Sequence, residues 1–269
     1  MRNFFVIVFI ALFVVCSKAD CDVYLQPNNF YRFAHELPFT PAYKTTAFLL
    51  LNDMVTNREL TPEIIECFAS DSTFSSIGLY LDDSLNLNEK KKADQYISQE
   101  VINSFMKVNS ARELIVVLIF STEKTAQEQI SRALTPFLPY AQQIDRVWVR
   151  TQLDSNCPDP TTYSDCQWPN ATYNQKYLNS AFAQVQTLGF NYGLYSTQSI
   201  WERWFPTNEQ LSVPVMYDGS DCYGKMSPNF SDYSPPIAGV QNPTKKVSCS
   251  WLASSKCCWL VNAAWEPKN

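Results

Sequence analysis

The sequence predicts an α/β fold in a single domain that is stapled by disulfide bonds. Apolar runs of strand length alternate with amphipathic helical patterns, which is typical of a parallel sheet covered by helices. No Gly/Ser/Pro linker, charge block or repeat divides the 269 residues, and α/β barrels of this length form one domain. Residues 1–19 have the features of a leader that is cleaved off. The cysteines in the rest of the chain are even in number, which indicates disulfides in an exported protein.

Residues 1–19 have the features of a secretory signal peptide. A basic residue precedes the apolar residues 4–15, and Ser17-Lys18-Ala19 supplies the small residues that signal peptidase requires. We therefore expect a mature domain over residues 20–269, exported to the extracellular space or to the lumen of a digestive or acidified compartment. The apolar run is short for a membrane span, and no later stretch reaches the required ~20 apolar residues. An uncleaved anchor is the alternative interpretation.

The cysteines predict disulfides rather than a metal site. Cys157 and Cys166 lie nine residues apart within one loop and form the clearest predicted pair. Cys257 and Cys258 are adjacent, so on a strand their side chains face opposite ways and each needs a different partner. The chain has no CxxC pair and a single histidine, His35, so we predict no metal.

The charge balance excludes one class of partner. Without the leader, 19 basic residues face the chain's 26 acidic ones, since two of its 21 basic residues are Arg2 and Lys18. Phosphate binding needs a basic footprint, so nucleic acid is not an expected partner. No glycine-rich phosphate motif is present, and we predict no cofactor. The sequons at Asn170 and Asn229 predict surface glycans on an exported chain.

Apolar runs predict the strands of the sheet. Most of them are continuously apolar, as expected of parallel strands buried on both faces. The runs cover residues 46–51, 76–81, 113–120, 146–153, 191–195 and 212–217. After Tyr217 the sequence is rich in turns and predicts no helix, although residues 247–251 and 259–263 have strand patterns.

Helical patterns fall between these strands. The first helix begins at Thr61-Pro62-Glu63, which combines an N-cap, a first-turn proline and an acidic residue near the positive end of the helix. Gly189 ends the fourth helix as a C-cap. Apolar stripes predict the remaining helices over residues 97–108, 126–137, 173–188 and 198–204.

Four groups of residues, in this order and spacing, resemble the family 25 lysozymes, especially the secreted lysozyme-like proteins of nematodes. They are Leu51-Asn52-Asp53 with Glu66-Cys67-Phe68, Arg146–Gln152, Gly193-Leu194-Tyr195-Ser196 with Gln198 and Trp201, and residues 227–233 with 242–246. The resemblance covers most of residues 45–267. It implies a TIM-like (β/α)5(β)3 barrel, and residues 20–44 form an N-terminal extension without a counterpart.

The resemblance fails at the family's catalytic acids. In the family, the strand corresponding to residues 146–152 ends in an Asp-x-Glu pair, whereas this chain has Arg150 and Gln152. Glycosidic cleavage requires a protonated acid and a second carboxylate. A guanidinium stays protonated at working pH, and a neutral amide has no acidic proton to donate. The sequence therefore predicts weak or absent hydrolysis.

Two aspartates are the remaining catalytic candidates. Asp53 ends the first predicted strand, where the family places an aspartate; a cap or an ion pair with Arg150 is the alternative role. Asp154 lies two residues beyond Gln152 and would face the same side of a continuing strand. Leu153-Asp154-Ser155 fits the pattern of a turn equally well, and this is the alternative interpretation of Asp154.

Aromatic residues near the strand ends are candidates for saccharide binding. Tyr80, Tyr195 and Tyr217, together with Asp218, could line a groove, because aromatic rings stack on sugar faces. Packing inside the barrel is the alternative role for the tyrosines. The long loop that contains the cysteine pair is a further candidate for ligand binding at the barrel mouth.

These observations predict a secreted lysozyme-like protein directed at bacterial cell-wall saccharide (peptidoglycan), acting in defence, as part of innate immunity, or in feeding. Two alternatives stay open. One is an active muramidase that uses Asp53 with a displaced acid such as Asp154. The other is a non-catalytic scaffold or decoy without a sugar site. The sequence indicates no particular oligomeric state.

Overall fold

A computed structural model describes a large part of the predicted domain. The described residues are 32–33, 43–53, 58–81, 97–120, 124–152, 170–196, 204–205, 213–219, 245–249, 252–254, 257 and 259–267. The predicted signal peptide, Asp154, Asn229 and the predicted pair Cys157–Cys166 lie outside these residues.

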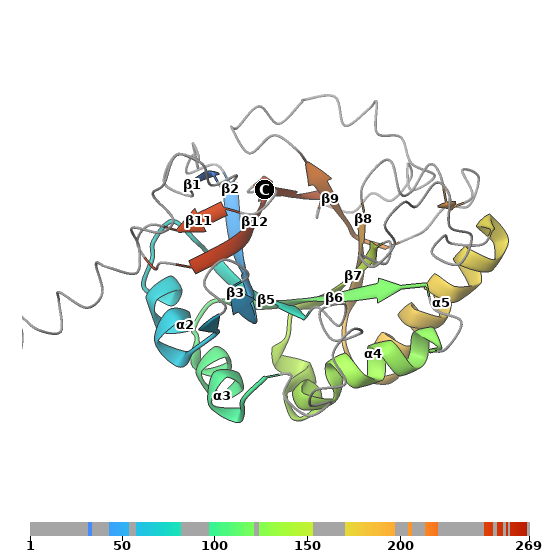
Figure 1. The fold of residues 1–269 in the computed structure, drawn as a ribbon, viewed down its shortest axis with the longest axis horizontal. Coiled ribbons are helices and arrows are strands. Elements are labelled where there is room, and N and C mark those ends of the chain that lie inside the picture. The colour runs from blue at the N-terminus through green and yellow to red at the C-terminus, as the bar shows by residue number, and fades with distance from the viewer. Residues whose placement is uncertain are drawn as a thin grey trace, which may run out of the picture.

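One large curled sheet forms the centre of the fold (Figure 1). Seven of its strands pair in parallel in chain order: β2 (Tyr43–Leu50), β5 (Ser76–Leu81), β6 (Ala111–Ile119), β7 (Arg146–Gln152), β8 (Tyr192–Ser196), β9 (Val215–Gly219) and β10 (Lys245–Cys249). The predicted strand over residues 76–81 has the bounds of β5, and the other predicted strands are displaced by a few residues at one or both ends.

The last long strand joins the two ends of this parallel run. Strand β12 (Trp259–Pro267) pairs antiparallel with β10 and also antiparallel with β2. Two short strands that the sequence did not predict, β11 (Leu252–Ser254) and β1 (Arg32–Phe33), continue the sheet from β12. A separate small antiparallel pair consists of β3 (Asn52–Asp53) and β4 (Arg58–Glu59).

Helices cover the outer face of the sheet along β5, β6, β7 and β8, and none of the described helices lies over β9 or β12 (Figure 1). The described α-helices are α2 (Pro62–Ala69), α3 (Gln99–Lys107), α4 (Ala126–Leu134) and α5 (Ala171–Thr187). The structure is thus a mixed α/β fold with a curled sheet. The full (β/α)5(β)3 count needs a fifth helix over residues 198–204, of which only Trp204 is described. None of the helices in the described ranges is both long enough and apolar enough to span a bilayer.

Two helix ends differ from the sequence expectation. The helix expected over residues 126–137 stops at Leu134 and continues as the 3₁₀ helix η3 (Thr135–Gln143), which contains Pro139. A proline lacks the N–H that an α-helix interior needs, and its ring clashes with the preceding turn. Thr61 occupies the N-cap of α2 without a side-chain cap bond, because its hydroxyl is bonded to the Glu63 carboxylate and lowers the pKa of that group. Gly189 does end α5, with a φ of +85°.

Inward and outward side chains alternate along the strands and form two apolar layers. The outer layer packs against the helices. The inner layer fills the centre of the curled sheet and consists of Phe48, Leu50, Tyr80, Ile115, Val117, Ile119, Trp148, Tyr195, Met216 and Ala264. The close packing requires glycine at position 193, where a Cβ would lie 2.6 Å from Cζ3 of Trp148.

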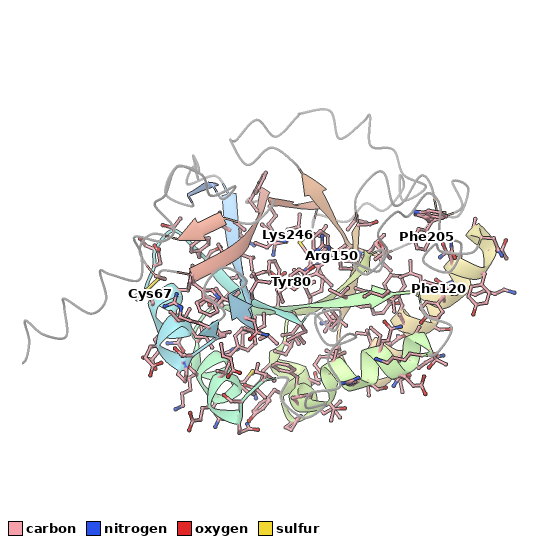
Figure 2. All side chains as sticks on the ribbon, viewed as in Figure 1. Cys67, Tyr80, Phe120, Arg150, Phe205 and Lys246 are labelled. Atoms are coloured by element: carbon pink, nitrogen blue, oxygen red, sulfur yellow. A yellow bond between two sulfur atoms is a disulfide. The ribbon has the colours of Figure 1, made fainter. Side chains whose placement is uncertain are left out.

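A disulfide between Cys67 and Cys257 joins α2 to the residues just before β12. Cys67 is a residue of α2 and lies toward the outer edge of the molecule (Figure 2). The two cysteines are separated by 190 residues, and the sequence did not identify them as a pair. Their bond confirms the prediction that a disulfide links parts of the fold. The pair Cys157–Cys166 stays a prediction.

Candidate functional site

Arg150 lies inside the curled sheet, near the carboxyl end of β7. It pairs in register with Val117 of β6 and Tyr195 of β8. The alternation along β7 places Arg150 on the same face as Trp148, which belongs to the inner layer. Figure 2 shows Arg150 and Tyr80 within the ring of strands. Carboxyl ends of parallel strands are where ligands bind in α/β barrels.

Two tyrosines surround the guanidinium of Arg150. Its Cζ lies 4.9 Å from the ring centroid of Tyr195 and 5.4 Å from that of Tyr80, both within the range of a cation–π contact. Nη1 of Arg150 donates a hydrogen bond to the Tyr80 hydroxyl. The Tyr195 hydroxyl in turn accepts a 2.9 Å bond from Nδ2 of Asn262 on β12. The arrangement holds a fixed positive charge between two ring faces.

The exposure of these three side chains differs. Tyr80 and Tyr195 are buried, at 1% and 0% of their possible surface, whereas Arg150 is half-buried. Of these three side chains, Arg150 is therefore the one that solvent reaches. A guanidinium can stabilise or bind a negative charge but cannot serve as a general acid. The sequence analysis named all three residues but did not predict this contact.

The other predicted site residues are placed by their backbone. Gln152 is the last residue of β7 and pairs with Ile119. Tyr217 and Asp218 lie in β9, the neighbour of β8, where Tyr217 pairs with Ser196. These positions share the carboxyl edge of the sheet with Arg150, because the three strands are adjacent and parallel.

Asp53 lies just beyond the carboxyl end of β2, as the sequence predicts, but in a strand of its own. It belongs to β3 and pairs with Arg58 of β4 in an antiparallel register. The hairpin is also held by the bond from the Leu60 N–H to the Leu51 carbonyl, at 2.8 Å. Asp53 therefore sits on a short hairpin beside the main sheet rather than on the end of its first strand.

A second charged cluster lies in the interior, at the amino-terminal end of the strands. Glu113 and Lys246 form a buried ion pair, with 10% and 2% of their side chains exposed. Nε1 of Trp148 donates to the Glu113 carboxylate, and the Thr46 hydroxyl donates to the same group over 3.4 Å. Val117, which pairs with Arg150, lies four residues after Glu113 on β6. The ion pair is therefore separated from the level of Arg150 by about 13 Å along the strand. These partners of Glu113 and Lys246 lie within the fold, and the cluster lies away from the edge at which α/β barrels bind ligands.

Sequence reasoning missed the Glu113–Lys246 pair. Glu113 begins an apolar run, and its inward position follows from the alternation with Ile115 and Val117. A charged residue whose side chain points into the sheet interior requires a buried partner of opposite charge. The sequence alone could therefore have predicted that Glu113 has such a partner. Nothing near Lys246 in the sequence identifies it as that partner.

Phe120, which follows β6, and two tyrosines at the start of α5 form another group that the sequence analysis did not single out. The ring centroids of Phe120 and Tyr173 are 5.7 Å apart, and those of Tyr173 and Tyr177 are 6.3 Å apart. Tyr173 is 47% exposed. Asn170, the predicted glycan site, caps this helix by accepting a 2.9 Å bond from the Tyr173 N–H.

The described residues offer no group of three or more histidine, cysteine, aspartate or glutamate side chains that could hold a metal ion. Among the described side chains, a guanidinium held between two tyrosines lies near the carboxyl ends of the strands.

Two comparisons find proteins that are similar to this chain. Residues 56–246 match the model of the family described as lysozyme-like protein 1. The fold is similar to that of the modular autolysin LytC from Streptococcus pneumoniae, whose structure was solved in complex with a synthetic peptidoglycan ligand. The TM-score is 0.57 at 10% sequence identity, over 84% of this chain and 47% of the LytC chain. The protein thus spans less than half the length of that chain.

A search of curated proteins finds no match. The family model covers well over half of the 269 residues, including all strands from β4 to β9. The chain therefore belongs to the lysozyme-like protein 1 family.

Proposed function

We propose that this protein binds bacterial cell-wall saccharide and hydrolyses it weakly or not at all. The observation that carries the proposal is Arg150, a guanidinium at the inner carboxyl end of β7, held by Tyr80 and Tyr195. The resemblance to family 25 lysozymes places a catalytic carboxylate at this position. A cation there can attract a ligand but cannot protonate a leaving oxygen.

Membership of a lysozyme-like family supports the choice of ligand. The similarity of the fold to an autolysin that was solved with a peptidoglycan ligand supports it further. Within this proposal, the saccharide site is bordered by Gln152, Tyr217 and Asp218. The guanidinium of Arg150 is held in position by the buried rings of Tyr80 and Tyr195. We propose that the role is in defence, as part of innate immunity, or in feeding.

We also propose that the curled sheet is the (β/α)5(β)3 barrel of the nematode-type family 25 branch. The pairing registers support this closure. The paired residues can be followed from one strand to the next, starting at a residue of β2 and passing through the parallel strands and β12. This path returns to β2 at a residue eight positions from the starting one. A displacement of about eight is the shear of an eight-stranded α/β barrel.

Export is part of the same proposal. The apolar leader over residues 1–19, the even number of cysteines that remain after its removal and the sequons at Asn170 and Asn229 support a secreted glycoprotein. The disulfide Cys67–Cys257 fits an oxidising compartment.

Binding and clearing of bacterial walls test the proposed function. The purified, oxidised protein is expected to sediment with insoluble peptidoglycan and to leave the turbidity of a wall suspension unchanged. If it does not sediment with the walls, the non-catalytic scaffold without a sugar site is the better account.

The active muramidase is the second candidate, and the position of Asp53 just beyond β2 favours it. Clearing of the suspension that disappears in Asp53→Ala or in Asp154→Ala would establish this alternative and contradict the proposed loss of hydrolysis.

A further inference from the structure

We propose that an N-linked glycan on Asn170 packs its first sugar against the exposed ring of Tyr173 and thereby stabilises the start of α5. The inference rests on the proposed export, because chains that enter the secretory route meet the enzyme that attaches such glycans. It goes beyond the sequon, which predicts attachment but gives the carbohydrate no role in the fold. The sugar belongs to the protein itself and is separate from any saccharide that the protein binds.

The side chain of Asn170 has one atom for the helix and another for the glycan. Asn170 is the N-cap of α5, and its Oδ1 accepts a 2.9 Å bond from the Tyr173 N–H. A backbone N–H can only donate, so the atom that faces it is the oxygen rather than Nδ2. A glycan is attached to Nδ2, which leaves the planar amide in a different direction from Oδ1. A glycosylated Asn170 therefore keeps the acceptor that caps the helix.

The sequon fits the attachment step. Residues 170–172 are Asn-Ala-Thr, and both Asn170 and Thr172 are exposed. In this step Nδ2 forms a bond to C1 of the first N-acetylglucosamine of a lipid-linked oligosaccharide diphosphate. The bond from C1 to the diphosphate oxygen breaks, the lipid diphosphate leaves, and Nδ2 gives up one of its two protons. The product carries its first sugar directly beside the cap of α5.

Tyr173 supplies the surface that this sugar covers. Its side chain is 47% exposed, which makes it one of two exposed large hydrophobic side chains in the described part of the chain. A side chain on a helix leans toward the N-terminus and covers the turn before its own Cα. Tyr173 follows Asn170 by three residues, a rise of about 4.5 Å along a helix. Its ring is therefore directed toward the cap, within the span of one sugar ring.

Neighbouring aromatic side chains hold the Tyr173 ring in place. Phe120 meets it edge to face with centroids 5.7 Å apart, and Tyr177 stacks beside it with centroids 6.3 Å apart. Tyr177 is buried, and its hydroxyl donates a 2.7 Å bond to the Lys124 carbonyl. These contacts join the start of α5 to the residues after β6. A sugar on Tyr173 therefore covers the joint between two elements.

Covering this ring favours the folded state. One face of N-acetylglucosamine carries apolar C–H groups, and burial of apolar surface against an aromatic ring is favourable. The covalent link keeps the sugar next to the ring at a high effective concentration, so no association from solution is needed. A ring that is already ordered also loses less conformational entropy when it is covered. The unfolded chain lacks α5 and does not hold the sugar and the ring side by side.

The experiment compares secreted protein with and without the sequon. The full chain is produced in a eukaryotic secretory host, and glycopeptide mapping should find Asn170 occupied. Thr172→Ala removes the sequon but leaves the Asn170 cap in place. We expect it to lower the midpoint of thermal unfolding by about 2–4 °C, the shift that one such contact produces in a domain of this length. Alanine is a better helix former than threonine, so helix propensity acts against this loss.

Thr172→Ser is the matched control, because it keeps the sequon, and its glycosylated fraction should keep the midpoint. In Tyr173→Ser, which lacks the ring, the further change Thr172→Ala should no longer lower the midpoint. Trimming of the glycan to a single N-acetylglucosamine should also leave the midpoint of the unchanged protein as it is, because the first sugar makes the contact. The sequon at Asn229 is kept in every sample, so a glycan there cancels from the comparison.

NMR of the unchanged glycoprotein needs no variant and so decides the matter even if Tyr173→Ser does not fold. The ring current of Tyr173 should shift proton signals of the first sugar upfield, and unfolding should remove the shift. Unshifted signals would overturn the inference and leave the proposed function standing. So would an unmodified Asn170 in secreted protein, or equal midpoints for the unchanged protein and Thr172→Ala. A chain that is not secreted would instead refute the proposed export on which the inference rests.

Discussion

Single residues decide the chemistry of this fold. In the proposed function, Arg150 stands where an active lysozyme has a carboxylate, and its two tyrosine partners show that the fold accommodates the cation. Glu113 and Lys246 illustrate the same dependence in the interior, where each charge is acceptable only because the other is present.

Removal of one member of the buried ion pair should be costly. Glu113→Gln or Lys246→Met leaves the remaining charge buried without its partner, and we expect a loss of about 3–5 kcal/mol in the free energy of unfolding. The double variant Glu113→Leu with Lys246→Met should recover much of this loss. Urea unfolding measures all three. Single variants that match the unchanged protein would show that the pair does not form.

At the scale of elements, helix ends combine local sequence and local bonding. The N-cap of α4 is a capping box in which Thr125 and Glu128 bond reciprocally. The N–H of Thr125 donates to the Glu128 carboxylate at 2.7 Å. This backbone bond is the largest cause that lowers the pKa of Glu128.

The lowered pKa of Glu128 predicts the sign of a pH effect. A carboxyl group whose folded pKa is depressed stabilises the fold above its unfolded pKa of about 4.3. That contribution is lost as the pH falls through the folded pKa. Glu128→Gln should therefore be less stable than the unchanged protein at pH 7, and the gap should shrink in acid. Thermal unfolding at both pH values measures the gap; a gap of constant size would contradict this account.

The elements also show what sequence patterns can and cannot predict. The apolar run at 76–81 and the helix before Gly189 were predictable, because burial on both faces and a left-handed C-cap leave clear local patterns. The end of α4 was missed because the apolar stripe continues into Phe137 while the prolines change the helix type. The β3–β4 hairpin at Asp53 has too few residues to show an alternation.

At the scale of the whole molecule, contacts between distant parts of the chain complete the structure. Strand β12 lies beside β2, and the disulfide joins Cys67 to Cys257 across 190 residues. Neither the partner of Lys246 nor that of Cys67 could be predicted from local sequence, because both contacts arise only when the sheet curls. The site has the same origin, since Tyr80, Arg150 and Tyr195 come from three different strands.

The disulfide should contribute strongly to stability, because it restricts a long segment of the unfolded chain. Replacement of both cysteines, Cys67→Ala with Cys257→Ala, should lower the free energy of unfolding by about 2–5 kcal/mol. Urea unfolding under non-reducing conditions measures the loss, and peptide mapping of the unchanged protein should recover the Cys67–Cys257 linkage. An unaltered midpoint in the double variant would show that the bond contributes nothing to the fold.

The most direct test of the central claim is the release of reducing sugar ends from purified peptidoglycan while the protein is bound to it. The proposed replacement of the catalytic acid by a cation predicts that the bound protein releases no more reducing ends than a heat-denatured sample. Release that rises with protein concentration and is abolished by Asp53→Ala would contradict the claim, because it would show that working acid chemistry persists beside Arg150.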